Sequence, residues 1–265
     1  MPMKPMVIAN WKLNPDTPKA AAALFLETYA AVSAVRDVNV VVCPPPLLVG
    51  AVAGARGAKR KVALGGQDCC AAERGAHTGE SSVATLRAYG AEYCILGHSE
   101  RRARGEHNEH VAEKVAMALT AGMNVVVCVG EHERTEEGTY YHTVREQLLV
   151  ALRGVKRSQL SSVVVAYEPV WAIGKSGSDA MQPAVLQEML LFLKKTLIET
   201  YGRAPAGRVR LLYGGSVKAE NARDMVHVGG AEGLLVGSAS LASEEFAAIV
   251  RAVRNDAGAG GVPQA

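Results

Sequence analysis

A short apolar run followed by an acid and a proline occupies residues 163–174, which read Val163-Val164-Val165-Ala166-Tyr167-Glu168-Pro169-Val170-Trp171-Ala172-Ile173-Gly174. Small and branched apolar residues of this kind are typical of a buried parallel strand. The proline ends that strand and restricts the backbone of Glu168 to an extended conformation. The acid thus stands where a general base in a dry pocket would be placed. Taken alone, Glu-Pro is more typical of an acid that faces solvent, so the interpretation depends on the rest of the chain.

Apolar runs alternate with longer amphipathic stretches along the whole chain. The patterns predict strands over residues 6–11, 38–43, 61–67, 93–97, 124–129, 163–167, 210–213 and 233–236, and helices over stretches such as 17–34, 108–121, 139–153 and 183–201. Unbroken alternation of strand and helix indicates an α/β protein with a parallel sheet. Eight such units in 265 residues favour a closed (β/α)₈ barrel over a doubly wound sheet. In addition, no Gly-rich dinucleotide turn follows the first strand.

No linker or shift in composition divides the chain. We therefore expect one barrel domain over residues 1–255, followed by a frayed tail over residues 256–265 that is rich in Gly, Pro and Ala.

The composition narrows the class of protein. Hydrophobic residues make up 49% and aromatic residues 5%, which suits a core of branched aliphatic side chains. A net charge of +3, without clusters of basic and aromatic residues, argues against nucleic acid as a partner. No signal-peptide core and no apolar run of membrane length is present. Five cysteines without paired metal spacing predict buried thiols in a reducing compartment, so we expect a soluble cytoplasmic protein without a metal: Cys43, Cys69, Cys70, Cys94 and Cys128.

Polar residues stand at the predicted C-terminal ends of three strands. The first strand delivers Asn10 and Lys12, which are alternate positions and so are expected to point to the same side, His98 follows the fourth strand, and Glu168 follows the sixth. In a barrel the C-terminal ends of all strands meet at one face, where active sites lie. An amide, an ammonium, an imidazole and a carboxylate on one rim therefore predict a catalytic site. Singly, a lysine is more typical of a solvated charge and a histidine of a capping residue, and residues 99–102 fit an ordinary charged helix start equally well.

Glycine-containing turns follow the last two predicted strands. The seventh ends in Tyr213-Gly214-Gly215-Ser216 and the eighth in Val236-Gly237-Ser238-Ala239. Successive backbone N–H groups in such turns form a concave anion site, and the loops after strands seven and eight are the usual phosphate site of these barrels. Glycines alone more often mark tight turns, so it is their position that favours phosphate.

The motifs together resemble the triosephosphate isomerase family over nearly the whole chain. The resemblance is carried, in order, by Ala9-Asn10-Trp11-Lys12, Gly97-His98-Ser99-Glu100-Arg101-Arg102, Cys128-Val129-Gly130-Glu131, residues 167–174, residues 213–216 and Leu235-Val236-Gly237. It implies a TIM barrel that interconverts dihydroxyacetone phosphate and glyceraldehyde 3-phosphate, a step of glycolysis and gluconeogenesis, without a cofactor.

The resemblance also implies catalytic roles for the rim residues. This family is a standard example of acid–base catalysis with tuned pKa values. Glu168 would move the proton, and a neutral His98 would hydrogen-bond the substrate oxygens. Lys12 would offset negative charge, Asn10 would add a donor, and Glu100 would pair with Lys12.

Further roles implied by the resemblance concern phosphate, a lid and a partner subunit. Backbone N–H groups of Gly174, Ser216, Gly237 and Ser238 would bind phosphate. The lid would run over residues 169–179 and include Pro169, Val170, Trp171, Ala172 and Ile173, with Glu131 as the partner of Trp171 and Tyr213 as a latch. From composition alone Trp171 fits a core position equally well. The family is typically a homodimer, in which Thr78 would brace the partner's first strand and Glu80 would pair with Arg101.

Two positions depart from the family pattern. Residues 175–179 read Lys-Ser-Gly-Ser-Asp where the lid usually continues Thr-Gly-Lys, and Ser238 stands where a second glycine is common. A backbone N–H survives a change from glycine to serine, so we expect a modest effect at residue 238 unless it needs a positive φ.

Two rival functions remain compatible with the fold. A phosphate-binding barrel that has lost turnover is the first, although Asn10, Lys12, His98, Glu100 and Glu168 are all retained. Another sugar-phosphate isomerase on the same barrel is the second, because fold does not fix function. Many such enzymes use metals or Schiff-base lysines, and neither pattern is evident here.

Overall fold

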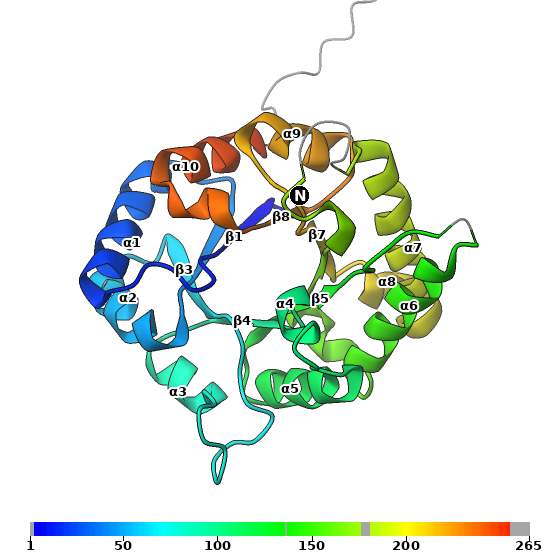
Figure 1. The fold of residues 1–265 in the computed structure, drawn as a ribbon, viewed down its shortest axis with the longest axis horizontal. Coiled ribbons are helices and arrows are strands. Elements are labelled where there is room, and N and C mark those ends of the chain that lie inside the picture. Colours follow the sequence, from blue (N-terminus) through cyan, green and yellow to red (C-terminus); the bar gives the residue numbers. More distant parts are fainter. Residues whose placement is uncertain (1–2, 136, 176–180, 255–265) are drawn as a thin grey trace, which may run out of the picture.

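Eight parallel strands close into a barrel in the order of the sequence, and helices surround it (Figure 1). The computed structural model describes residues 3–135, 137–175 and 181–254. The strands are β1 (Met6–Asn10), β2 (Asn39–Cys43), β3 (Val62–Gly66), β4 (Tyr93–Leu96), β5 (Asn124–Val129), β6 (Val163–Tyr167), β7 (Arg210–Tyr213) and β8 (Gly233–Val236). The barrel closes where β8 pairs with β1, with Gly233 opposite Met6. The predicted (β/α)₈ barrel is confirmed.

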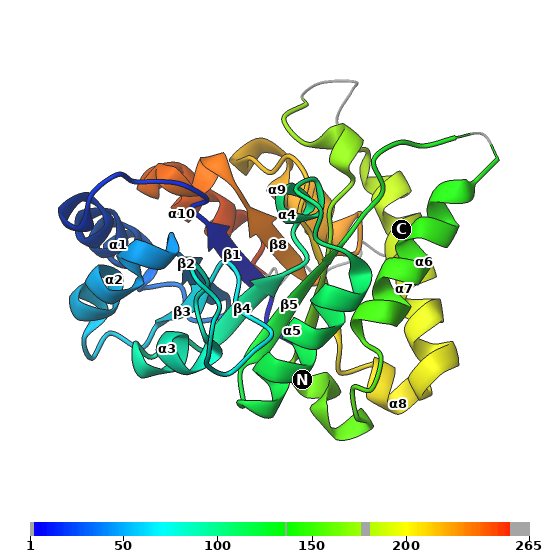
Figure 2. The same cartoon turned by 60° about the horizontal axis from the view of Figure 1, so that its bottom comes forward.

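Helices flank the barrel on all sides. They are α1 (Pro18–Val32), α2 (Val49–Arg56), α3 (Val83–Ala88), α4 (Ser99–Arg102), α5 (Asn108–Thr120), α6 (Thr139–Ala151), α7 (Pro183–Tyr201), α8 (Arg203–Ala206), α9 (Ala219–His227) and α10 (Ser243–Ala252), with 3₁₀ turns η1 (Pro46–Leu48), η2 (Arg157–Ser162), η3 (Val170–Ala172) and η5 (Ser238–Leu241). In both views α1, α2 and α10 lie on one side of the barrel and α6, α7 and α8 on the opposite side (Figure 2). No helix in the described part of the chain is long and apolar enough to cross a membrane.

Local sequence explains where several helices begin. Thr17 precedes α1, and its hydroxyl accepts the backbone N–H of Ala20 at 3.2 Å, while Pro18 occupies the first helical position. Ser82 starts α3 in the same way, accepting from Thr85 at 3.1 Å. Both are standard N-terminal signals, because a side-chain oxygen satisfies an N–H group that the helix leaves unpaired.

The strands are apolar on both faces. Met6 and Ile8 belong to the cluster that fills the barrel interior, whereas Val7 and Ala9 belong to the larger cluster between strands and helices. Because both faces are buried, the strands read as continuous apolar runs without polar alternation. This is why they are visible in the sequence.

Three strands, β1, β3 and β4, end one residue earlier than predicted. β1 stops at Asn10, whose side-chain Oδ1 accepts the backbone N–H of Lys12 at 3.1 Å, and Lys12 has a left-handed φ of 52°. β4 stops at Leu96 because Gly97 has a φ of 70°. Lys12 is therefore positioned by a tight turn and not, as predicted, by alternation along the strand.

The barrel from β1 to α10 accounts for residues 6–252. The predicted tail, residues 256–265, and residues 176–179 of the predicted lid lie outside the described residues.

Candidate active site

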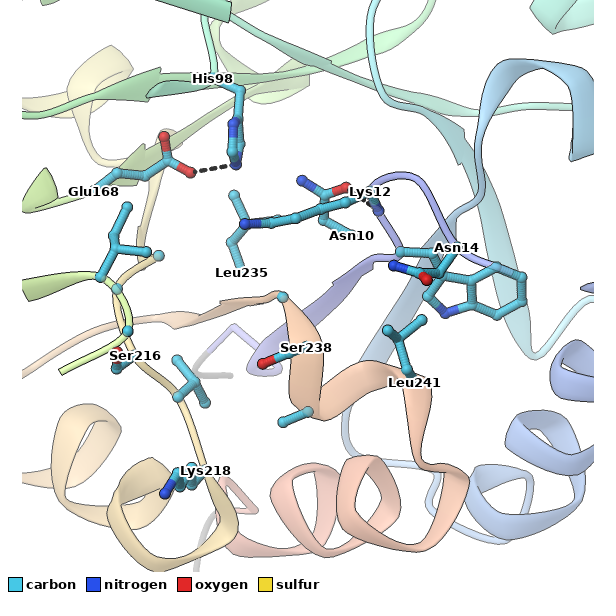
Figure 3. A pocket seen from close by; sticks show the side chains of 18 of the residues that line it. Asn10, Lys12, Asn14, His98, Glu168, Ser216, Lys218, Leu235, Ser238 and Leu241 are labelled. Carbon is cyan, nitrogen blue, oxygen red and sulfur yellow. Dashed lines mark hydrogen bonds and ion pairs between the residues drawn. The ribbon is translucent and has the colours of Figure 1, made fainter. Parts of the chain in front are cut away.

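A pocket of about 750 Å³ opens at the C-terminal ends of the strands (Figure 3). It brings together eight of the residues predicted for catalysis and phosphate binding: Asn10, Lys12, His98, Glu168, Gly174, Ser216, Gly237 and Ser238. These residues are far apart in the chain and come from the ends of β1, β4, β6, β7 and β8 or the segments that follow them. The barrel closure is what makes them neighbours.

Glu168 follows β6 directly and is only 2% exposed. Its backbone N–H donates to the carbonyl of Val129 at 2.8 Å, which continues the ladder between β5 and β6. Its carboxylate Oε1 lies 3.1 Å from His98 Nε2, and Oε2 accepts the backbone N–H of Ser99 at 2.9 Å. A buried carboxylate is thus held by two donors at the pocket wall, of which Figure 3 shows His98.

His98 caps the short helix α4, and this contact defines its tautomer. Its Nδ1 accepts the backbone N–H of Glu100 at 3.2 Å, so Nδ1 carries a lone pair. A neutral ring then carries its proton on Nε2, the atom that faces Glu168. The predicted cap and the predicted catalytic histidine are therefore the same residue.

Lys12 reaches across the pocket to Glu100, with Nζ 2.5 Å from Oε1. Burial alone would raise the pKa of the Glu100 carboxyl, but the hydrogen bond and charge of Lys12 outweigh it and leave this pKa lowered. Gln67 Nε2 donates to the Lys12 carbonyl at 2.8 Å and to the Cys43 carbonyl at 2.9 Å, which fixes the turn after β1. Asn10 is 5% exposed and lines the pocket beside them.

Three glycines next to Glu168 or Tyr213 are required by packing. A Cβ at Gly130 would lie 1.8 Å from the carbonyl oxygen of Glu168, and one at Gly214 would lie 2.9 Å from its Cγ. A Cβ at Gly215 would lie 2.3 Å from the Tyr213 hydroxyl. Glycine at residues 214 and 215 therefore lets the backbone after β7 approach the side chains of Glu168 and Tyr213.

The backbone after β8 fits a serine at residue 238. Ser238 begins the 3₁₀ turn η5 and lines the pocket (Figure 3). Among the described non-glycine residues only Lys12 has a positive φ, so residue 238 does not need glycine. Gly237 lies beneath the Lys12 side chain, since a Cβ there would be 3.4 Å from Cε.

The predicted lid begins at Pro169 and forms the 3₁₀ turn η3 over Val170–Ala172. Trp171 Nε1 donates to Glu131 Oε1 at 2.8 Å, and the Ala172 carbonyl accepts the Ser216 hydroxyl at 3.0 Å. Ile173 lines the pocket.

A cluster of side chains between β5 and β6 supports Trp171. The Tyr167 hydroxyl also donates to Glu131 Oε1, at 2.8 Å, and Arg134 lies 3.1 Å from the same oxygen with its guanidinium 5.3 Å from the Trp171 ring. Tyr213, the predicted latch, is fully buried, and burial raises the pKa of its phenol.

The residues predicted to contact a partner subunit lie at the edge of the pocket or beyond it. Thr78 and Glu80 are exposed in the segment between β3 and α3, which projects from the ring of helices (Figure 1). Within this chain Arg101 is paired with Asp68 at 2.8 Å and with Glu106 at 3.2 Å.

Several contacts were not foreseen from the sequence. The Ser99 backbone N–H holds Glu168, yet a backbone donor carries no residue-type signal. Leu235 and Lys218 also line the pocket. Lys218 follows the Gly214-Gly215-Ser216 turn closely, and this proximity is the feature of the sequence that indicates a place for Lys218 at the pocket. No group of three or more His, Cys, Asp or Glu side chains that could hold a metal occurs among the described residues.

Comparison with known proteins agrees with the motifs. The family model described as triosephosphate isomerase matches residues 5–253. Curated relatives of that name include those of Carboxydothermus hydrogenoformans (42% identical over 251 residues, 94% of this chain and 98% of the relative), Trichlorobacter lovleyi (41% over 251 residues, 93% and 98%) and Idiomarina loihiensis (37% over 258 residues, 96% and 100%). The resemblance drawn from the motifs is confirmed: this chain belongs to the triosephosphate isomerase family.

Proposed function

We propose that this protein interconverts dihydroxyacetone phosphate and glyceraldehyde 3-phosphate by moving one proton through an enediolate, without a cofactor. The observation that carries the proposal is the pairing of the buried Glu168 carboxylate with His98 Nε2 at 3.1 Å, opposite Lys12 in one pocket. The names of the relatives support the same reaction.

Glu168 acts as the base in this proposal. It removes a proton from the carbon beside the carbonyl and returns it to the neighbouring carbon. His98 donates from Nε2 to the oxygen on which negative charge develops, and Lys12 offsets the charge of enediolate and phosphate. The Asn10 amide adds a further donor, and Glu100 holds Lys12 in place. Donors fixed in advance around a growing anionic charge stabilise the transition state most effectively in a pocket that excludes water.

Substrate binding must break a contact seen in this structure. His98 Nε2 now faces Glu168, and the Ser99 N–H holds the other carboxylate oxygen. A substrate oxygen that takes the His98 proton donor frees one side of the carboxylate for the substrate's C–H group. Substrate entry therefore makes the His98 donor and the Glu168 base available at the same time.

Phosphate binding falls to the opposite side of the pocket. Ser216, Gly237 and Ser238 follow β7 and β8 there, and Gly174 lines the same pocket from the lid segment. Their backbone N–H groups form an anion cradle, and Lys12 adds positive charge above Gly237. The segment from Pro169 to Ile173 closes over the substrate, which keeps water from the enediolate.

Ser238→Gly tests how the departure from the family pattern at residue 238 affects the anion cradle. We expect kcat to stay within about threefold of the parent, because a side chain that leaves the backbone donor in place accounts for about 0.5 kcal/mol or less. Competitive inhibition by inorganic phosphate measures the cradle separately from the chemistry. A tenfold loss of both phosphate affinity and kcat in this variant would contradict a cradle built from backbone donors.

The active form is a homodimer in this proposal. Two large apolar side chains, Leu13 at 85% and Leu47 at 95% exposure, stand beside a second opening of about 260 Å³ that reaches Asn10, Lys12 and His98 from the side. An opening of this kind suits the projecting segment of a second copy, which carries Thr78 and Glu80. Arg101 lines the same opening, and in the homodimer it would pair with Glu80 of that copy.

Leu47→Asp tests the dimer. We expect the variant to sediment as a monomer at micromolar concentration and to lose activity, because a charge would be buried at the contact and Lys12 would lose its support. Analytical ultracentrifugation measures the association. Leu191→Asp is the matched control, since Leu191 is 65% exposed on α7, across the barrel from η1. A parent that sediments as a monomer with full activity would overturn the homodimer.

The compartment is the cytoplasm in this proposal. All five cysteines are buried free thiols, as a reducing compartment would keep them. Three features stay predictions: the lid over residues 176–179, the tail over residues 256–265 and the single domain over residues 1–255.

A coupled assay that follows consumption of glyceraldehyde 3-phosphate tests the reaction. We expect fast isomerisation of the three-carbon phosphate and none of hexose or pentose phosphates, because a pocket closed by a short lid excludes longer chains. A protein that binds a triose phosphate without converting it would be the phosphate-binding barrel that has lost turnover. Equal turnover of a longer sugar phosphate would indicate a different sugar-phosphate isomerase.

A further inference from the structure

Arg102 makes three hydrogen bonds to three different elements behind the active site. It is the last residue of α4, and its side chain turns back toward the barrel. Nε donates to the Gly97 carbonyl at 2.8 Å, Nη2 to the Cys128 carbonyl at 3.3 Å, and Nη1 to the side chain of Asn108, at the start of α5, at 2.6 Å. The guanidinium thus joins the end of β4, the strand β5 and the helix α5.

The Cys128 carbonyl lies where a strand partner is missing. The register between β4 and β5 ends with Leu96 opposite Val127. Two residues after Val127, the carbonyl of Val129 points to β6 and accepts the Glu168 N–H at 2.8 Å. Successive carbonyls of a strand point to opposite neighbours, so the Cys128 carbonyl faces the side that β4 has already left. Arg102 supplies the donor that the strand no longer provides, which a buried carbonyl needs.

The Gly97 carbonyl lies at the turn that carries the catalytic groups. Gly97 has a φ of 70°, and a Cβ there would lie 3.0 Å from Arg102 Nη2, so the guanidinium packs directly against this turn. The next two residues are His98, whose Nε2 faces Glu168, and Ser99, whose N–H holds the Glu168 carboxylate. A shift of the turn would therefore move both partners of Glu168 together.

We propose that Arg102 is a positioning residue for the isomerisation. Its planar fork clasps the end of β4 to β5 and so fixes His98 and the Ser99 N–H relative to Glu168. The inference rests on the proposed function for its kinetic consequences, but the geometry belongs to the turn itself. A lysine keeps the charge but presents a single ammonium, which cannot reproduce the fork between two carbonyls.

Arg102→Lys and Arg102→Gln separate geometry from charge. We expect both variants to lose about 100-fold in kcat with little change in KM, because a catalytic group misplaced by about 1 Å costs that much. Asn108→Ala is the matched control, since it removes the contact to α5 and leaves both carbonyl contacts, and we expect kcat near that of the parent. Thermal unfolding of each variant ensures that rates are compared on folded protein. Full activity in Arg102→Lys would overturn the proposal, as would an equal loss in Asn108→Ala, which would assign the effect to docking of α5.

A double substitution tests whether Arg102 acts through His98. Arg102→Lys added to His98→Gln should lower kcat much less than it does in the parent, because one of the two groups that it positions is already gone. Losses that multiply independently would contradict the proposal.

The nitrogen-15 resonances of the His98 ring give a readout without turnover. The parent should show a neutral ring protonated at Nε2, and Arg102→Lys should shift or broaden these signals. A parent that fails to isomerise would defeat the proposed function alone, while unchanged His98 signals in Arg102→Lys would defeat the role of Arg102 alone.

Discussion

Glu168→Gln is expected to lower kcat by about 10²- to 10⁴-fold, the range that a positioned general base contributes. The amide has nearly the same shape but does not take up a proton. In the parent, both carboxylate oxygens accept hydrogen bonds, from His98 Nε2 at 3.1 Å and from the Ser99 N–H at 2.9 Å. Glutamine keeps one acceptor oxygen but places its NH₂ group opposite one of these two donors. The side chain therefore also has to rotate away from that donor.

Glu168→Asp refines this prediction. It keeps the base but withdraws it by one methylene, so an intermediate loss is expected from distance alone. Glu109→Gln, on the exposed face of α5, is the control for the loss of one carboxylate and should leave kcat unchanged. Steady-state rates in both directions measure the effect. Near-parent turnover in Glu168→Gln would mean that another group removes the proton.

Lys114→Met is expected to reduce the free energy of unfolding by about 3–5 kcal/mol, the cost of removing one partner from a buried ion pair. Lys114 is fully buried, with Nζ at 2.9 and 2.8 Å from the two carboxylate oxygens of Asp68 and at 2.5 Å from Glu106. Burial would raise the pKa of Glu106, but its ion pairs with Lys114 and Arg101 outweigh burial and leave this pKa lowered. For Asp68 burial prevails, and its pKa is raised.

Methionine fills the space of the lysine chain but leaves two carboxylates with Arg101 as their remaining partner in this cluster. The cluster joins the segment after β3 to the start of α5, so its loss should also loosen the base of the projecting segment. Urea unfolding measures the change. Lys195→Met is the matched control, because Lys195 is 76% exposed and 3.9 Å from Glu199, and such a pair contributes about 0.5 kcal/mol. Equal stability of both variants would contradict a structural role for the buried cluster.

The barrel was predictable because its strands are buried on both faces. The predicted bounds of β5, β6, β7 and β8 are those observed, since each is a continuous apolar run. β1 and β4 were extended too far, because the Asn10 side chain and the left-handed Gly97 end these strands within apolar sequence. Turn chemistry prevailed there over the apolar pattern.

The site was predictable as far as residue types carry chemistry. Glu168, His98 and Lys12 stand at strand ends, and barrel closure makes them neighbours. The Ser99 backbone donor has no signature in the sequence, and Gly130 is explained only once the Glu168 carbonyl is seen beside it. Nothing in the sequence marks Lys114 as buried, since lysines are rarely buried unless paired and its partner Asp68 is distant in the chain.

Deuterium transfer from solvent tests the central claim most directly. In heavy water, proton nuclear magnetic resonance would follow dihydroxyacetone phosphate as the parent and Glu168→Gln convert it. A proton that passes through a carboxylic acid exchanges with solvent, so deuterium should appear at the carbon beside the new carbonyl in the parent and at a far slower rate in the variant. Deuterium incorporation and isomerisation by Glu168→Gln at the parent rates would contradict an enediolate formed by Glu168.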